Sequence, residues 1–424
     1  MLPELLRSRG ITGRDAALAT ELAYGTCRVR GLLDAVLARC VDRELSAVET
    51  DVLDALRLGG YQLLRTRIPP HAAVASTVDL VRASRGRGPA GFVNAVLRKV
   101  AERDEPSWVA ELAPGEHADP VGHLAFAHAH PRWVAQAFVD ALGDRGDELA
   151  RALAADNEAP AVHLAARPGE VTVDELAALT GGEPAPFSPY GVHLRGGDPA
   201  EFDVVAEHLA TVQDEGSQLV ALALANAPLT GPDTGRWLDL CAGPGGKAVL
   251  LGALVGLDGG TLDAVERAEH RANLVRRACV DLPVRVHVAD GRDSGLPAAS
   301  FDRVLVDVPC TGLGALRRRP EARWRRTPDD IEGLTALQTQ LLTAALRLVR
   351  PGGVVGYVTC SPHPAETVGV VRAVTAAGAV LGVTELDARP LLPGVPDLGD
   401  GPHVQLWPHR HGTDAMFCAL LRRS

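Results

Sequence analysis

The stretch from Trp237 to Val249 reads WLDLCAGPGGKAV and constrains the fold more than any other part of the chain. It predicts a short apolar strand, a glycine-rich turn and the start of an apolar helix. Glycines at 243, 245 and 246 remove the Cβ atoms that would keep a ligand away from the backbone. The first turn of the helix directs free N–H groups to the same place. We therefore expect a nucleotide-like ligand here.

Three kinds of site use a turn of this type. A Walker phosphate-binding loop is excluded, because Cys241 and Ala248 occupy the positions that require glycine and Ser or Thr. A dinucleotide-binding fingerprint fits from Gly243 to Ala248, with Glu266 at a suitable distance for a ribose-binding acid. The first strand of an S-adenosylmethionine-dependent methyltransferase ends in a similar turn. The turn alone does not choose between the last two.

Length and composition limit the classes of protein to which the chain can belong. A chain of 424 residues predicts two or three domains. It has no apolar stretch of about eighteen residues and no signal-peptide pattern at its start, so we expect a cytoplasmic protein without a membrane segment. Its seven cysteines are widely spaced and form no C-x-x-C pair, so we expect neither a disulfide framework nor a metal site. The formal charge of −10 does not by itself suggest a nucleic-acid partner, for which local patches matter more.

Hydrophobic patterning divides the chain into three parts. Residues 1–128 read as all-helical, because apolar residues such as Leu32, Val36 and Cys40 recur at helical spacing. Residues 129–218 indicate a small α+β linker domain, with strands at 161–166 and 192–194 and a short helix at 173–179. Residues 219–424 alternate strands and helices, which is typical of an α/β doubly wound sheet with largely parallel strands.

The strands of this third region are expected at 237–240, 261–265, 284–288, 303–306 and 354–359, with a helix at 334–348 and edge strands at 380–383 and 416–421. Ligands of such sheets bind beyond the carboxyl ends of the strands. Polar residues that close these strands are therefore expected to converge at one edge: Asp239, Glu266, Asp290, Asp307 with Cys310, and Cys360.

If the ligand is an adenosine-containing cofactor, each of these acids has its own expected role. Glu266 would accept hydrogen bonds from ribose hydroxyls, Asp290 would accept one from the adenine amine, and Asp307 would reach a methionine amino group or a substrate base. Lys247 is one of only two lysines among 43 basic residues, so its position favours a compact ammonium over a guanidinium. The turn itself would supply Cys241, Ala242, Gly243, Pro244, Gly245, Gly246 and Lys247.

Two cysteines each follow a strand at a bent turn, in Pro309-Cys310-Thr-Gly and Thr359-Cys360-Ser-Pro. A nicotinamide-dependent oxidoreductase has no obvious need for both. Methylation of cytosine at carbon 5 does need a thiol, because addition of a thiolate at carbon 6 makes carbon 5 nucleophilic. A second group must then help to remove the carbon 5 proton. The cysteine pair therefore favours pyrimidine methylation.

An arginine-rich segment, residues 316–326, lies between the two cysteines. It contains six arginines, one acid and a tryptophan that we expect to be exposed. Arginines that contact phosphates and an aromatic ring that stacks on bases suit single-stranded RNA. The expected RNA-binding residues are Arg317, Arg318, Arg319, Arg323 and Trp324.

Several motifs resemble those of the RsmB/Sun family of RNA 5-methylcytosine methyltransferases: LDLCAGPGGK at 238–247, DVPCTGLG at 307–314, RRRPEARW at 317–324 and YVTCS at 357–361. Segments at 24–26, 56–64 and 92–98 resemble the RNA-binding fold of the NusB antitermination factor. Together the resemblances cover essentially the whole chain. Among the departures are Gly243 where the family often has Ala, and Glu266 where Asp is commoner.

The resemblance implies a multidomain protein: a NusB-like helical RNA-binding domain at 1–128, an α+β linker or RNA-binding subdomain at 129–218, and a Rossmann-like methyltransferase domain at 219–424. It implies that the turn with Glu266, Asp290 and Asp307 binds S-adenosylmethionine. Cys360 would be the nucleophile and Cys310 would assist release of the product. The expected substrate is an unpaired or flipped-out cytosine of small-subunit ribosomal RNA, and nothing requires more than a monomer.

Two other interpretations stay open. A DNA cytosine methyltransferase would use the thiol of the Pro-Cys motif, Cys310, as its nucleophile. A non-catalytic RNA-binding assembly factor would keep the fold without the activity, although the intact pair of cysteines argues against it. The sequence does not identify the target nucleotide.

Overall fold

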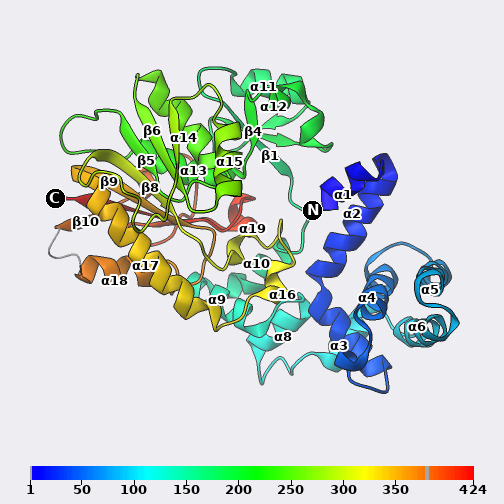
Figure 1. The fold of residues 1–424 in the computed structure, drawn as a ribbon. Helices are drawn as coiled ribbons and strands as arrows, with labels where there is room; N and C mark the ends of the chain where they lie inside the picture. The colour runs from blue at the N-terminus through cyan, green and yellow to red at the C-terminus, as the bar shows by residue number, and fades with distance from the viewer. Residues whose placement is uncertain (1, 378–381) are drawn as a thin grey trace. The chain divides into compact units, whose positions relative to one another are not determined.

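The computed structural model describes residues 2–377 and 382–424 (Figure 1). Contacts group these residues into two units: the chain up to Asn157 together with Arg319–Arg326, and Glu158–Arg318 together with Thr327–Ser424. The predicted domain boundaries at 128 and 218 stay a prediction. Within the described ranges, no helix combines the length and the apolar character that a bilayer span requires.

The first unit consists of helices, as predicted. Apolar stripes of α3, α4 and α6 meet in one core, where Leu37, Leu56 and Leu97 are fully buried. Gly59 lets α4 pass close to α6, because a Cβ there would lie 2.6 Å from Leu97. The helices are α1 (Leu2–Ser8), α2 (Gly13–Arg28), α3 (Arg30–Cys40), α4 (Thr50–Arg65), α5 (Pro70–Arg85), α6 (Arg87–Val100), α7 (Glu105–Leu112), α8 (Pro120–Ala127), α9 (Arg132–Leu142), α10 (Leu149–Ala155) and the distant α16 (Ala322–Arg325).

The second unit begins with a small antiparallel sheet of strand order β2-β3-β1-β4. The predicted strands and short helix of this region are confirmed. Leu164, Leu176 and Val192 form its core, and the side chains of Thr172 and Glu175 cap the helix reciprocally. The elements are β1 (Val162–Ala166), α11 (Val173–Thr180), β2 (Glu183–Pro184), β3 (Gly191–Leu194), α12 (Asp203–Ala206) and β4 (Ala210–Val212).

The rest of the second unit is an eight-stranded sheet of order β10-β12-β9-β8-β5-β6-β7, with β11 beside β12. Strands β5 to β9 are mutually parallel, as predicted. The strands are β5 (Arg236–Asp239), β6 (Thr261–Glu266), β7 (Val284–Val288), β8 (Phe301–Asp307), β9 (Val349–Thr359), β10 (Val383–Leu386), β11 (Val404–Gln405) and β12 (Phe417–Arg423). The helices are α13 (Glu215–Ala225), α14 (Gly246–Leu257), α15 (Glu269–Ala278), α17 (Asp330–Leu348), α18 (Val368–Ala377) and α19 (Pro408–His411).

Alternation along the strands divides the apolar residues between two cores. In β5, Trp237 belongs to the core under α13 and α14, whereas Leu238 belongs to the core under α17 and α18. Figure 1 shows these helix groups on opposite faces of the sheet. The result is the three-layer α/β architecture that the alternating pattern predicted.

The edge-strand expectation is partly wrong. The expected strand at 416–421 corresponds to β12, which begins at Phe417 and pairs antiparallel with β9 on one side and with β10 on the other. Its residues Phe417 to Leu421 are fully or almost fully buried because both faces are covered. The expected strand at 380–383 falls partly outside the described residues, and β10 begins at Val383.

Candidate active site

The carboxyl ends of β5, β6, β7, β8 and β9 lie at one edge of the sheet because these strands are parallel. The strand order reverses between β5 and β8, which is where α/β sheets of this kind bind ligands. Backbone hydrogen bonds hold the glycine turn between its neighbours: Leu240 N–H donates to Leu305 O at 2.8 Å, and Ala242 N–H donates to Val265 O at 2.9 Å. The structure thus brings the predicted strand-end residues to one edge.

The glycine turn and Glu266 form a close-fitting cradle. A Cβ at position 243 would lie 2.2 Å from Glu266 Oε2, so only glycine leaves this carboxylate in place. The carboxylate accepts a hydrogen bond from Ala268 N–H at 2.9 Å and lies 3.3 Å from Arg271 Nε. Gly245 has φ +122° and precedes the first residue of α14, Gly246. The helix α14 thus begins three residues after Gly243, and its first N–H groups have no partner within the helix.

Lys247 contacts an acid of the neighbouring strand. Its Nζ lies 2.8 Å from Asp307 Oδ2 and 3.3 Å from Ser217 Oγ, and 11% of its side chain is exposed. Burial alone would lower the pKa of Lys247, but the charge and hydrogen bond of Asp307 raise it above its usual value. Burial, followed by the charge of Asp307, raises the pKa of nearby Asp239 to about 7. The ammonium therefore compensates two acids at this edge.

Asp290 is already engaged by a neighbour. Arg292 contacts both of its oxygens, at 2.9 Å and 2.7 Å, and the Arg292 N–H donates to Oδ1 at 3.0 Å. These hydrogen bonds lower the pKa of Asp290 to about 2. The carboxylate is therefore ionised at neutral pH, and its predicted contact with an adenine amine would share acceptor lone pairs with Arg292.

The two predicted cysteines are adjacent. Cys310 Sγ and Cys360 Sγ lie 3.4 Å apart, because their turns follow the paired strands β8 and β9. The hydrogen bond with Cys360, together with burial, raises the pKa of Cys310 well above its usual value. Burial also raises the pKa of Cys241 in the glycine turn. Cys310 and Cys241 are therefore thiols at neutral pH.

The predicted RNA-binding residues are not one exposed patch. In the second unit, Arg318 contacts the buried carboxylate of Asp414, with its Nε 3.0 Å from Oδ1. Arg317 is buried, and its Nη2 donates to Gly412 O at 3.0 Å. Both arginines face protein acceptors, although Arg318 keeps 42% of its side chain exposed.

In the first unit, Arg319 is exposed, but Arg323 is not. Arg323 Nη1 donates to Arg28 O at 2.9 Å, Ala129 O at 3.1 Å and Asn157 Oδ1 at 2.8 Å, and the side chain is fully buried.

Trp324 belongs to the same contact. Its indole Nε1 donates to Cys27 O at 2.7 Å, and its ring packs against Gly31. The expectation of an exposed tryptophan is wrong, because the ring fills a gap that the missing side chain of Gly31 leaves. Arg323 and Trp324 attach residues 319–326 to the helices of the first unit, whereas Arg319 and Arg325 of the same segment stay exposed.

Sequence reasoning missed the polar residues behind the cysteines. Glu366 is fully buried between the two cysteine turns and accepts hydrogen bonds from Thr311 and Ser361. The only signal was an acid in an otherwise neutral segment six residues after Cys360. Asp214 was also missed: burial, followed by the charge of Asp414, raises its pKa to about 6.

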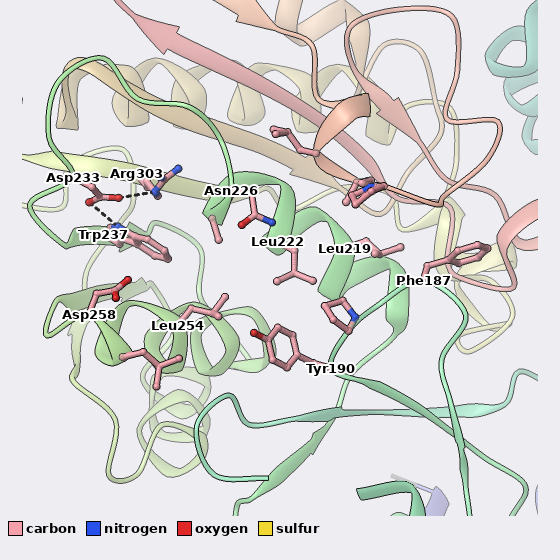
Figure 2. A pocket seen from close by; sticks show the side chains of 16 residues that line it. Phe187, Tyr190, Leu219, Leu222, Asn226, Asp233, Trp237, Leu254, Asp258 and Arg303 are labelled. Atoms are coloured by element: carbon pink, nitrogen blue, oxygen red, sulfur yellow. Dashed lines mark hydrogen bonds and ion pairs between the residues drawn. The ribbon is translucent and has the colours of Figure 1, made fainter. Parts of the chain in front are cut away.

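A separate cavity of about 440 Å³ lies away from this edge (Figure 2). Trp237 and Arg303, near the amino ends of β5 and β8, contribute to its wall and both contact Asp233. Phe187, Tyr190 and Leu222 form much of its apolar surface. It contains none of the predicted site residues and lies toward the opposite ends of the strands.

The residues at the carboxyl edge fit S-adenosyl-L-methionine. Glu266 presents a carboxylate at the cradle, where acceptors for ribose hydroxyls belong, and α14 supplies free N–H groups. Asp307 keeps 29% of its side chain exposed beside Lys247 and offers an acceptor for an amino group.

Comparisons with known proteins agree with this geometry. Residues 227–422 match the family model described as 16S rRNA methyltransferase RsmB/F, and residues 2–102 match the NusB family. The chain is 59% identical to a protein of Mycobacterium tuberculosis named as a methyltransferase, Rv1407, over 100% of this chain and 92% of that protein. It is 34% identical to ribosomal RNA small subunit methyltransferase B of Pseudomonas putida, over 88% of this chain and 84% of that protein.

A solved structure, that of PH0851, shares the fold with a TM-score of 0.81 and 23% identity, over 99% of this chain and 93% of that one. These matches confirm the predicted family resemblance, the NusB-like N-terminal region and the cofactor S-adenosyl-L-methionine. The chain belongs to the RsmB/F family of ribosomal RNA methyltransferases.

Proposed function

We propose that this chain methylates carbon 5 of a cytosine in small-subunit ribosomal RNA, in the cytoplasm, with Cys360 as nucleophile and Cys310 assisting release. The observation that carries the proposal is the pair of sulfur atoms 3.4 Å apart beside the glycine turn. A methylation that used an amine or a hydroxyl of the substrate would not need two thiols at the reacting edge. The relatives named as ribosomal RNA methyltransferases support the choice of RNA.

The chemistry follows from the two thiols. The thiolate of Cys360 adds to carbon 6 of the cytosine, and the resulting S–C6 bond makes carbon 5 nucleophilic. S-adenosyl-L-methionine supplies the electrophilic methyl group. The carbon 5 proton then passes to water, the electron pair of the C5–H bond restores the C5–C6 double bond, and the electron pair of the S–C6 bond returns to Cys360. We assign Cys310 to this last step.

Lys247 and Asp307 would bind and orient the reactants. Asp307 is assigned to the cofactor amino group or to the substrate base, and Lys247 holds its carboxylate at 2.8 Å. The glycine turn, Glu266 and Asp290 are assigned to the cofactor. Arg319 is an exposed member of the arginine segment and is assigned to a phosphate.

The test compares the wild type with Cys310→Ser and Cys360→Ser on small-subunit ribosomal RNA and on small-subunit particles, with radiolabelled S-adenosyl-L-methionine. Methylated RNA and denaturant-resistant protein–RNA adduct are both measured. We expect Cys310→Ser to accumulate adduct and Cys360→Ser to form neither adduct nor product. Cys27→Ser, which changes a thiol of the first unit, serves as the control.

Three outcomes would contradict the proposal. Methylation by Cys360→Ser with loss of activity in Cys310→Ser would favour the DNA-type mechanism, and DNA would then be tested as the substrate. Cofactor binding without transfer to either RNA or particle would favour a non-catalytic assembly factor. A modified base other than 5-methylcytosine, identified by mass spectrometry, would overturn the assigned chemistry.

A further inference from the structure

Glu366 occupies the turn before α18 and is fully buried. Its Oε1 accepts hydrogen bonds from Thr311 N–H at 2.9 Å and from Gln338 Nε2 at 2.9 Å. Its Oε2 accepts from the hydroxyls of Thr311 and Ser361, the latter at 2.6 Å. All four donors are neutral. Burial of a carboxyl group is costly unless such donors replace water, so this is an organised site and not a surface acid that happens to be covered.

Each contact reaches one of the two cysteine turns. Thr311 follows Cys310 directly, and Ser361 follows Cys360 directly. Gln338 also donates to Pro309 O at 2.9 Å, so the same network holds the residue before Cys310. The single carboxylate of Glu366 therefore joins two turns that are far apart in the chain.

The backbone of Glu366 is fixed as well. The hydroxyl of Tyr357, a buried residue of β9, donates to Glu366 O at 2.6 Å. Because Cys360 directly follows β9, Glu366 is anchored to the strand that leads into the thiol it helps to orient. A shift of this carboxylate would change the separation of the two sulfur atoms.

We propose that Glu366 is the positioning residue of the two-cysteine site, and that its carboxylate sets the separation and orientation of Cys310 and Cys360. This inference rests on the proposed function, since it assigns the two thiols to successive steps on one base. The charge has a second effect: after the hydrogen bond and charge of Cys360 and the burial of the thiol, Glu366 contributes to the raised pKa of Cys310. It thereby helps to keep Cys310 protonated while Cys360 attacks.

Two substitutions distinguish the effect of the Glu366 hydrogen bonds from the effect of its charge. In Glu366→Gln, the amide oxygen can accept from Thr311 N–H and Gln338, and the amide N–H₂ can donate to the two hydroxyls, which rotate to accept. This variant keeps the connection and loses the charge. Glu366→Ala loses both and leaves the buried donors unpaired.

The matched control is Asp302→Asn. Asp302 is another fully buried carboxylate of the same sheet, near the amino end of β8, where it accepts from Thr234 and Arg350. It lies at the opposite end of the strand from Cys310. A loss of stability without an effect on the thiols is expected for this variant.

The first measurement is the single-turnover rate of RNA methylation together with the yield of adduct. We expect Glu366→Ala to lose about 100-fold in rate, as for a reacting group misplaced by about 1 Å. We expect Glu366→Gln to stay within about 10-fold of the wild type, and both to bind S-adenosyl-L-methionine as the wild type does. The inference is overturned if Glu366→Ala keeps the wild-type rate, or if all three variants lose rate in proportion to their loss of stability.

The second measurement does not depend on methylation. The rate of alkylation of each cysteine by iodoacetamide is followed against pH by mass spectrometry, without RNA. Loss of the negative charge in Glu366→Gln should shift the alkylation of Cys310 to lower pH, whereas Asp302→Asn should leave it unchanged. If the wild type forms neither 5-methylcytosine nor adduct, the proposed function fails. The alkylation profile then still decides whether Glu366 controls the thiols, and an unchanged profile would refute the inference.

Discussion

Gly243 and Glu266 fit together so closely that a Cβ on the glycine would lie 2.2 Å from the Glu266 Oε2 atom. The carboxylate has little freedom to retreat, since Ala268 N–H and Arg271 hold it. The position of the Glu266 carboxylate at the end of β6 therefore requires a residue without a side chain at position 243.

We predict that Gly243→Ala weakens S-adenosyl-L-methionine binding by about 10-fold, or about 1.4 kcal/mol, because the added methyl group displaces the Glu266 carboxylate. Glu266→Asp shortens the acid by about 1.5 Å, one carbon–carbon bond. In the double variant it should restore part of the affinity. Isothermal titration calorimetry of both single variants and the double variant measures the coupling. Gly333→Ala, at an open position of α17, is the control. Strictly additive losses would argue against the fit described above.

The stability of the cofactor-free protein should depend on the protonation of Asp239. This residue is 1% exposed, and its pKa of about 7 compares with 3.8 for an unperturbed carboxyl. Between these values the folded protein holds a proton that the unfolded chain has lost. The free energy of unfolding contributed by Asp239 therefore falls as pH rises from about 4 to about 7, by at most about 1.4 kcal/mol per pH unit.

Asp239→Asn should remove this contribution, since the amide oxygen still accepts from Cys241 N–H and carries no charge. Urea titrations of wild type and variant at several pH values within this window measure the difference. The variant should lose less stability than the wild type as pH rises. Parallel curves would show that Asp239 does not titrate there.

Arg323 should stabilise the first unit and should not contribute to the salt dependence of RNA binding. Its fully buried guanidinium donates to two carbonyls and to Asn157 through Nη1, and burial lowers its pKa to about 10. Arg323→Met leaves these acceptors unpaired, so we expect a loss of about 3 kcal/mol in the free energy of unfolding, measured by urea titration.

Arg319→Ala is the matched control from the same segment. Because Arg319 is exposed, its loss should leave the unfolding free energy nearly unchanged and should reduce the slope of RNA affinity against salt concentration. Arg323→Met with normal stability and a reduced salt slope would reverse this assignment.

The sequence predicted the parts of this molecule that follow from local patterns. Alternating strands and helices, the glycine turn and the polar strand ends are periodic or positional signals, and parallel strands bring their carboxyl ends to one edge whatever the loops do. The proximity of Cys310 and Cys360 follows in the same way, because β8 and β9 are neighbours.

What the sequence did not predict depends on burial and on distant partners. An arginine-rich segment predicts a solvated surface. Arg323 is nevertheless buried, because it donates to main-chain carbonyls whose positions cannot be predicted from composition. Glu366 likewise has no pattern of its own, since its donors come from three separate segments of the chain.

The assignment of residues 319–326 to the first unit has a consequence for how this protein is made. Synthesis proceeds from the N-terminus, so the helices before Asn157 leave the ribosome long before the segment that carries Arg323 and Trp324. The carbonyls that accept hydrogen bonds from Arg323 can form them only after most of the second unit has been translated. A gene divided between the codons for residues 157 and 158 would therefore yield two incomplete products. The helical fragment would lack the side chains that donate to its backbone carbonyls, and the catalytic fragment would carry Arg323 and Trp324 without their acceptors.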